Sequence, residues 1–262
     1  MTIFNHEVKQ NRKMLFIWSG VVGFMIIICM IMYPEMQTQM TDFESIFANM
    51  GDFTAAFGMD KINFGSAMGF YGIECGNVLG IGGAFFAALI GVGVLSKEEN
   101  GHTAEFLLTH PISRFSVVTQ KLLAVICQIL FLNIFCMVCS IASFGIIGES
   151  IAWREFLLFH MAQLFLQIQI ASICFGISAF VKRGGIGIGL GFAALLYFLN
   201  IIGNISEEAD FVKYITPFKY AEPSDIISDA TVSWVLISVG AVYAVAGIVF
   251  AFVRYTKKDI AS

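Results

Sequence analysis

Six long apolar blocks dominate this sequence of 262 residues. Each block is long enough for a helix to cross the hydrocarbon core of a bilayer, which takes about 20 residues. An oversized soluble core is excluded because 58% of the residues are hydrophobic and only 13% are charged, against about 25% charged in an ordinary soluble domain. The sequence therefore predicts an all-α membrane protein, a single domain over 1–262. Its six transmembrane helices are expected at about 14–33, 69–95, 120–147, 155–181, 185–205 and 232–253.

The basic residues predict how these helices are oriented. Most of the 15 lysines and arginines lie on the side that holds both chain ends, the 96–119 loop and the 182–184 turn. The opposite side has only Lys61, Arg154, Lys213 and Lys219. Because cytoplasmic loops carry the excess of Lys and Arg, we expect both termini in the cytoplasm. We also expect the chain to lie in the plasma membrane of a bacterium. A net charge of −4 gives no reason to expect a nucleic-acid partner.

Two outer loops carry patterns of their own. In 41–57, apolar residues such as Phe43, Phe47 and Phe53 recur at three- and four-residue spacing, with acidic and amide residues between them. This spacing predicts an amphipathic helix that lies in the outer interface. The 206–231 loop carries acidic residues and two prolines, and we expect it to cap the outer face.

Small residues recur every four positions in the second block. They are Gly72, Gly76, Gly80, Ala84 and Ala88. Such a row forms one ridge on a helix and lets another backbone approach closely. Two explanations stay open, namely packing within one chain and a moving or dimeric helix interface.

A few polar residues fall inside the apolar blocks. They are His160, Gln163 and Gln167 in the fourth block and Glu74 in the second. Polar groups at membrane depth face the bundle or a water-filled path, so interhelical hydrogen bonding and the lining of a substrate pathway are both consistent with them. Gln128 and Asn133 in the third block are candidate partners. Glu74 either reaches the outer headgroups or belongs to a gate.

Enzyme signatures are missing from the sequence. It has no HExxH, no GxSxG and no GxxxxGK[ST] phosphate-binding loop, the motifs of metalloproteases, hydrolases and P-loop ATPases. The six cysteines lie in apolar blocks without a metal-ligand spacing, so we interpret them as small apolar packing residues. No metal site is predicted, and any ATP that the protein uses must bind to another chain.

The loop between the second and third blocks has the most specific pattern. Thr103 is a suitable N-cap with Glu105 in the first turn, and Pro111 ends that short helix. Ser113 can cap the next helix, which continues into the third block. The short helix, expected over 99–110, exposes Phe106 and its apolar neighbours beside acidic residues. An exposed apolar patch with a charged rim is typical of a protein-docking surface.

At these residues the sequence resembles the permease subunit of type-2 ATP-binding-cassette (ABC) transporters. Members carry a pattern close to EExGTxExLLxxP[IV]SR followed by a basic residue and two leucines. The matching positions are Glu98, Glu99, Gly101, Thr103, Glu105, Leu107, Leu108, Pro111, Ile112, Ser113, Arg114, Lys121, Leu122 and Leu123. His102 stands between Gly101 and Thr103, where many members have these two residues adjacent.

The resemblance implies a permease subunit of an ATP-driven exporter. Such a subunit pairs with a second permease copy or a homologue and docks two cytoplasmic ATPase subunits, which bind the ATP and Mg²⁺. The 99–110 helix would then be the coupling helix. Two alternatives stay open: a non-transporting immunity or sensory subunit, and an ion-coupled secondary transporter. The latter would need charged residues deep in several blocks, and only Glu74 and His160 come close.

Overall fold

The computed structural model describes residues 2–38, 51–59, 61–97, 113–181 and 185–257. These residues form helices and turns and no strand. The helical elements are α1 (Thr2–Thr38), α3 (Asp52–Ala56), α4 (Ala67–Phe70), the π-helix η1 (Tyr71–Cys75), α5 (Gly76–Val92), α8 (Arg114–Ile147), α9 (Trp153–Ser178), α10 (Ile186–Ile205), the 3₁₀ helix η2 (Glu207–Tyr214), α11 (Pro223–Asp229) and α12 (Trp234–Lys257).

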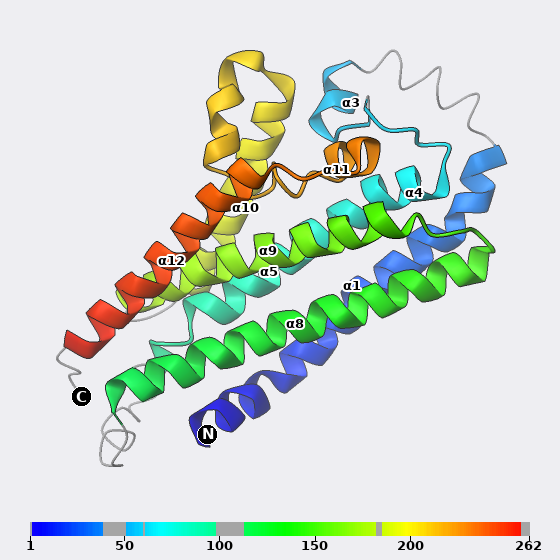
Figure 1. The fold of residues 1–262 in the computed structure, drawn as a ribbon. Coiled ribbons are helices and arrows are strands. Elements are labelled where there is room, and N and C mark those ends of the chain that lie inside the picture. Colours follow the sequence, from blue (N-terminus) through cyan, green and yellow to red (C-terminus); the bar gives the residue numbers. More distant parts are fainter. Residues whose placement is uncertain (1, 39–50, 60, 98–112, 182–184, 258–262) are drawn as a thin grey trace.

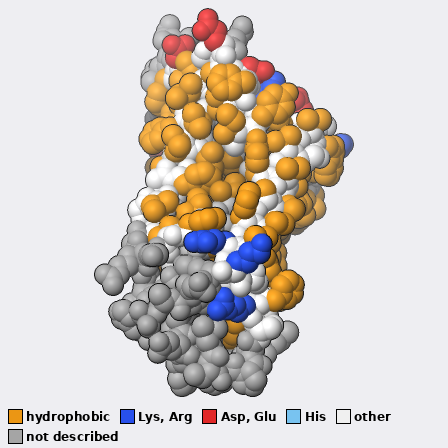
Figure 2. All heavy atoms as spheres, turned by 90° about the vertical axis from the view of Figure 1, so that its left-hand side faces the viewer, with side chains coloured by type: hydrophobic (Ala, Val, Ile, Leu, Met, Phe, Trp, Pro, Cys, Tyr) orange, Lys and Arg blue, Asp and Glu red, His pale blue; other side chains and the backbone are white. Residues whose placement is uncertain are grey.

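Six helical stretches of the described chain are long and apolar enough to cross a bilayer. They are α1, the continuous run α4–η1–α5, and α8, α9, α10 and α12. Each overlaps one predicted block, so the all-α class with six transmembrane helices is confirmed. Figure 2 shows the corresponding surface, where apolar side chains form a broad belt with basic residues towards one end and acidic residues at the other.

Local signals set where several helices begin and end. The Ser113 hydroxyl accepts a hydrogen bond from the Ser116 amide at 3.2 Å and caps α8 as predicted. Gly148 ends the same helix with a φ of 76°, a conformation that glycine adopts without a steric penalty. Ser66 caps α4 through the Gly69 amide at 3.0 Å.

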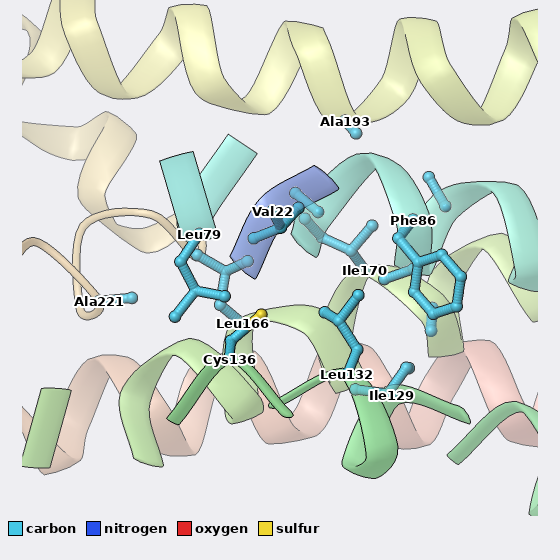
Figure 3. Packing of buried hydrophobic residues seen from close by; sticks show 14 of the residues in the cluster. Val22, Leu79, Phe86, Ile129, Leu132, Cys136, Leu166, Ile170, Ala193 and Ala221 are labelled. Atoms are coloured by element: carbon cyan, nitrogen blue, oxygen red, sulfur yellow. The ribbon is translucent and has the colours of Figure 1, made fainter. Parts of the chain in front are cut away.

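Two helices, α5 and α9, form the centre of the bundle. In Figure 1, α9 runs beside α5, while α1 and α8 lie side by side below them. The α10 helix packs on α5, and α12 packs on α9. Figure 3 shows side chains such as Val22, Leu79, Leu132 and Leu166 meeting in the interior from α1, α5, α8 and α9. In contrast, few residues of α12 are buried within the chain.

The first helix extends past its predicted limits of 14–33 in both directions. Its early turns are polar in sequence, but Ile3, Glu7 and Asn11 are buried and share one face. Since a helix brings residues four apart to the same side, this face packs on α8 beneath the apolar part of the span. The predicted block therefore missed a packed extension at the N-terminal end of the helix.

The outer segments are described in part. Residues 41–50 of the predicted amphipathic helix lie outside the described residues, whereas Asp52–Ala56 is helical as α3. Its Ala56 carbonyl accepts a hydrogen bond from the Asn204 amide at 3.3 Å. Figure 1 shows α3 and α11 at one end of the bundle, opposite both chain termini.

Candidate functional site

Of the predicted coupling residues, the structure describes only Arg114. Nine of them lie outside the described residues: Glu98, Glu99, Gly101, Thr103, Glu105, Phe106, Leu107, Leu108 and Pro111. Arg114 is described, as the first residue of α8, and its guanidinium donates to the Thr256 carbonyl of α12 at 3.3 Å. The docking role of these residues stays a prediction.

A buried ionic cluster brackets this segment. The Lys121 ammonium lies 2.8 Å from one carboxylate oxygen of Glu7, and the Lys97 ammonium lies 3.1 Å from the other. Lys97 also donates to the Asn11 side-chain oxygen at 2.9 Å, and Lys121 donates to the Val94 carbonyl. Lys121 and Glu7 are 0% and 1% exposed. The cluster therefore joins the first turns of α1, the segment that follows α5 and the first turns of α8, on either side of 98–112.

Breaking this cluster would be costly. Removing one partner of a buried ion pair leaves an uncompensated charge in a low-dielectric surrounding. The three helix ends are thus held as one unit by charge as well as by packing.

His160, the outermost of the predicted pathway residues on α9, joins a buried hydrogen-bonded chain. Its Nε2 lies 2.9 Å from the hydroxyl of Tyr71, which lies 2.8 Å from the hydroxyl of Ser140. Both His160 and Tyr71 are buried. Tyr71 belongs to η1, and π-helical turns within α-helices often mark functional sites.

Gln167 contacts α8 deeper in the bundle. The Asn133 side-chain amide donates to the Gln167 oxygen at 2.8 Å, which confirms Asn133 as a partner of this face. Gln128 donates to the Ala124 carbonyl of its own helix instead. Like His160, Gln167 faces the interior and not the bilayer.

Gln163 holds a loop that enters the bundle from the end opposite the chain termini. Its amide donates to the Ala221 carbonyl at 3.2 Å. The Tyr220 hydroxyl donates to the Gln169 oxygen at 2.8 Å, and the Thr216 hydroxyl donates to the Leu196 carbonyl at 2.8 Å. Leu196 lies midway along α10, so residues 215–222, called the inserted loop below, reach the middle of the bundle. Non-helical backbone is tolerated there when protein groups satisfy it.

Several of these interior groups keep unused hydrogen-bonding capacity. Within the described residues, Nδ1 of His160, Oε1 of Gln163 and Nε2 of Gln167 are buried without a partner. Buried polar atoms are normally satisfied, so each such atom needs an explanation. A cavity of about 20 Å³ lies beside Gln163 and the inserted loop, and that volume suits a single water molecule.

A polar network holds the inserted loop at its outer end. Glu222 is buried and accepts hydrogen bonds from the Asn200 and Asn204 amides at 2.7 and 3.2 Å. Burial raises its pKa above the ordinary value, although these bonds and nearby Lys219 oppose that rise. Asp225 bridges Lys61 and Lys219 at 3.0 and 2.9 Å. Burial alone would raise the pKa of Asp225, but the two lysines bring it below the ordinary value.

Glu74, the remaining predicted pathway residue, stands apart from this interior. It lies on η1 and is half-buried, and it makes no hydrogen bond or ion pair within the described residues. Its role in a gate stays a prediction.

The small-residue ridge faces other parts of the same chain. A Cβ at Gly72 or Gly76 would come within 2.2 Å of Ile227 or 2.6 Å of Pro223. A Cβ at Gly80 would lie 3.5 Å from Gln163. Ala84 and Ala88 are fully buried. Packing within one chain therefore accounts for the ridge as it stands, and its part in a moving or dimeric interface stays a prediction.

Sequence reasoning missed Glu7 and Tyr71. Glu7 has a signal in the sequence, because Ile3, Glu7, Asn11 and Leu15 recur every four residues and continue the buried face of α1. Tyr71 has no such signal, since an aromatic residue near the end of an apolar block is ordinary. Among the described residues, no group of three or more His, Cys, Asp or Glu could hold a metal ion.

Comparison with known proteins identifies the family of this chain. The family model described as "ABC-2 family transporter protein" matches residues 1–260. The chain belongs to this family. The ABC-2 match confirms the resemblance seen in the loop motif, and with the six spans it makes the chain a multi-pass membrane protein of an ABC transporter family.

One curated relative gives little further detail. The uncharacterized protein YhcI of Bacillus subtilis (strain 168) is 23% identical over 202 residues. The matched part covers 68% of this chain and 64% of YhcI, just under two thirds of that protein. No solved structure gives a significant match.

Proposed function

We propose that this chain is the membrane permease subunit of an ATP-driven ABC exporter. It docks two separate cytoplasmic ATPase subunits through the 99–110 helix and forms the substrate pathway with a second permease copy or a homologue. ATP and Mg²⁺ bind to the ATPase partners, and both termini of the permease lie in the cytoplasm. Membership of the ABC-2 family supports the permease role.

The observation that carries the coupling part of the proposal is the Glu7–Lys97–Lys121 cluster. Lys97 directly precedes the segment with the coupling motif, and Lys121 follows it on α8. A push on that segment by an ATPase would therefore be transmitted to α1, α5 and α8 together. Helices joined in this way move as a rigid group, the behaviour that an alternating-access transporter needs.

The interior supports a pathway that is closed in this conformation. The inserted loop makes hydrogen bonds with Gln163 and Gln169 of α9 and so lies inside the bundle. We infer that the loop is the outer gate and that its withdrawal exposes the His160, Gln163 and Gln167 face. The unused polar atoms on that face would then meet water or a polar part of the substrate.

The test is assembly with an ATPase. The chain is co-expressed with a candidate ABC ATPase subunit from the same organism, purified through a tag on the permease, and assayed for ATP hydrolysis. Glu99→Lys combined with Phe106→Ala is expected to lose most of the bound ATPase, because both changes alter the proposed docking helix. Arg12→Glu combined with Phe24→Ala, at exposed positions of α1, is the matched control and should bind normally.

Two results would contradict the proposal. If the docking variant binds the ATPase and supports hydrolysis like the wild type, the 99–110 helix is not the coupling element. If the assembled complex hydrolyses ATP but no cargo accumulates outside vesicles in any transport assay, the non-transporting immunity or sensory role replaces the exporter role.

A further inference from the structure

An apolar groove opens on the side of the bundle formed by α9, α10 and α12. It encloses about 620 Å³ and is lined by residues that include Ile173, Ile177, Phe192, Leu196, Tyr243 and Phe250. Its volume lies within the roughly 300–1,000 Å³ of sites that enclose small ligands. Phe250 is 62% exposed, so the groove faces the surroundings of the bundle and not its core.

A close contact of two glycines holds the floor of the groove. A Cβ at Gly176 of α9 would lie 2.7 Å from the Gly247 carbonyl of α12. The two backbones therefore touch, as small residues permit in membrane helices. The groove is consequently a fixed feature of how α12 crosses α9.

The two ends of the groove differ in chemistry. Ile215 of the inserted loop lines one end, near the middle of α10. Phe180 lines the other end, where the Arg254 guanidinium lies 5.6 Å from the centre of its ring. Arg114 reaches the same end of α12 through the Thr256 carbonyl. Figure 2 shows Lys and Arg side chains gathered below the apolar belt on this side of the molecule.

We propose that this groove binds one acyl chain of an anionic phospholipid, with Arg254 contacting the phosphate of its headgroup. The lining suits hydrocarbon, and a basic mouth between membrane helices complements an anionic headgroup. The groove runs only from mid-bundle to the basic end. A single acyl chain suits this apolar lining and leaves its anionic headgroup at the basic mouth. The lipid belongs to the leaflet at the basic end of the bundle.

Native mass spectrometry of the purified full chain tests this proposal with two probes, palmitoyl-oleoyl phosphatidylglycerol and palmitoyl-oleoyl phosphatidylcholine. The two lipids share their acyl chains and differ in headgroup charge. The wild type is expected to prefer phosphatidylglycerol. Arg254→Gln should reduce that preference roughly fivefold, the effect of one basic residue at an anionic surface. Arg12→Gln, the same charge change at an exposed position of α1, should leave the preference unchanged.

A second pair of variants separates the groove from the general surface. Ala246→Phe fills the groove and is expected to lower the occupancy of both lipids, while Ala241→Phe, at an exposed position of α12 outside the lining, should not. Equal losses in Arg254→Gln and Arg12→Gln would overturn the headgroup contact. If Ala246→Phe changes self-association of the chain and leaves lipid occupancy unchanged, the groove is an interface between copies and the proposal is wrong. Neither outcome depends on ATPase docking, so failure of the lipid proposal would not contradict the permease proposal.

Discussion

At the scale of single residues, the Glu7–Lys97–Lys121 cluster shows how a buried charge is tolerated in this protein. Glu7 is buried because Lys97 and Lys121 pair with its two oxygens, one each. The Val94 carbonyl accepts a further hydrogen bond from the Lys121 ammonium. Each charge thus has a partner, and the pair becomes costly only when one member is lost.

The first prediction concerns that loss. Lys121→Met should lower the free energy of unfolding by about 3–5 kcal/mol, because it removes the fully buried one of the two ammonium groups that pair with the Glu7 carboxylate. The double variant Glu7→Leu with Lys121→Met should be less destabilised than Lys121→Met alone. Thermal unfolding in detergent measures both. Lys9→Met, on an exposed part of α1, is the control, and additive effects of the two changes would contradict the pairing.

Glu222 predicts a pH dependence with a definite sign. Its pKa in the folded chain is raised above 4.5, with burial as the cause. The folded chain therefore holds this proton more tightly than the unfolded chain, and stability falls as pH rises from about 4.5 through the raised pKa. Glu222→Gln keeps an oxygen that can accept from Asn200 and Asn204. At a pH above the raised pKa, Glu222→Gln should melt at a higher temperature than the wild type. Its melting temperature should also change less with pH between about 4.5 and the raised pKa.

Asp225 should behave in the opposite sense. Its lowered pKa contributes stability above 3.8 that is lost as pH falls below that value. Asp225→Asn should therefore melt at a lower temperature than the wild type at pH 7, and the difference should shrink in acid. Asp229→Asn, a change of the same kind at an exposed residue of α11, is the control. If Glu222→Gln and Asp225→Asn shift the melting temperature in the same direction at pH 7, the opposite charge effects assigned to Glu222 and Asp225 are wrong.

At the scale of elements, α5 and α9 approach more closely than ordinary side chains allow. A Cβ at Gly91 would lie 2.7 Å from the Ala171 carbonyl. Because that oxygen belongs to the backbone, it cannot rotate away. Gly91→Ala should therefore destabilise the chain by about 1–3 kcal/mol, the usual effect of overpacking. The control is Gly145→Ala in α8, where nothing lies within 4 Å, and it should gain about 0.5–1 kcal/mol of helix stability in the same melting experiment. Equal changes in melting temperature for Gly91→Ala and Gly145→Ala would mean that the close approach of α5 to α9 does not affect stability.

The inserted loop is the element most directly tied to the proposed mechanism. Gln163→Cys and Ala221→Cys allow a short, reducible thiol cross-linker to join the loop to α9, where the native side chain meets the Ala221 carbonyl. If the loop is the outer gate, the cross-linked complex with its ATPase should hydrolyse ATP more slowly, and a reductant should restore the rate. Each single cysteine variant is the control. Full activity in the cross-linked state would show that the loop does not move during the cycle.

At the scale of the whole molecule, charge asymmetry predicts orientation. Figure 1 shows both termini at one end of the bundle and α3 and α11 at the other. We expect the end with the termini to face the cytoplasm, since the basic residues gather there. Arg12→Cys should react with a membrane-impermeant maleimide only after cells are opened, and Glu149→Cys should react in intact cells. Both positions are exposed, and the wild-type chain is the blank. Labelling of Arg12→Cys in intact cells would reverse the orientation.

The sequence alone determined the fold class and most of the span limits, because a bilayer accepts only long apolar helices with satisfied backbones. It also identified which side of α9 is polar, since His160, Gln163 and Gln167 share a helical face. Of the two candidate partners that the sequence offered, Asn133 contacts Gln167 and Gln128 bonds to its own helix. These inferences depend on composition and helical period, which are local properties of the chain.

Only the tertiary structure decided what those groups contact. The role of Gln163 depends on the inserted loop, 58 residues further along the chain. The role of Glu7 depends on Lys121, 114 residues away. Helical period places a residue on a face, but it does not specify which distant segment covers that face. The groove beside α12 exists for the same reason, because Gly176 and Gly247 set a backbone contact that neither helix encodes by itself.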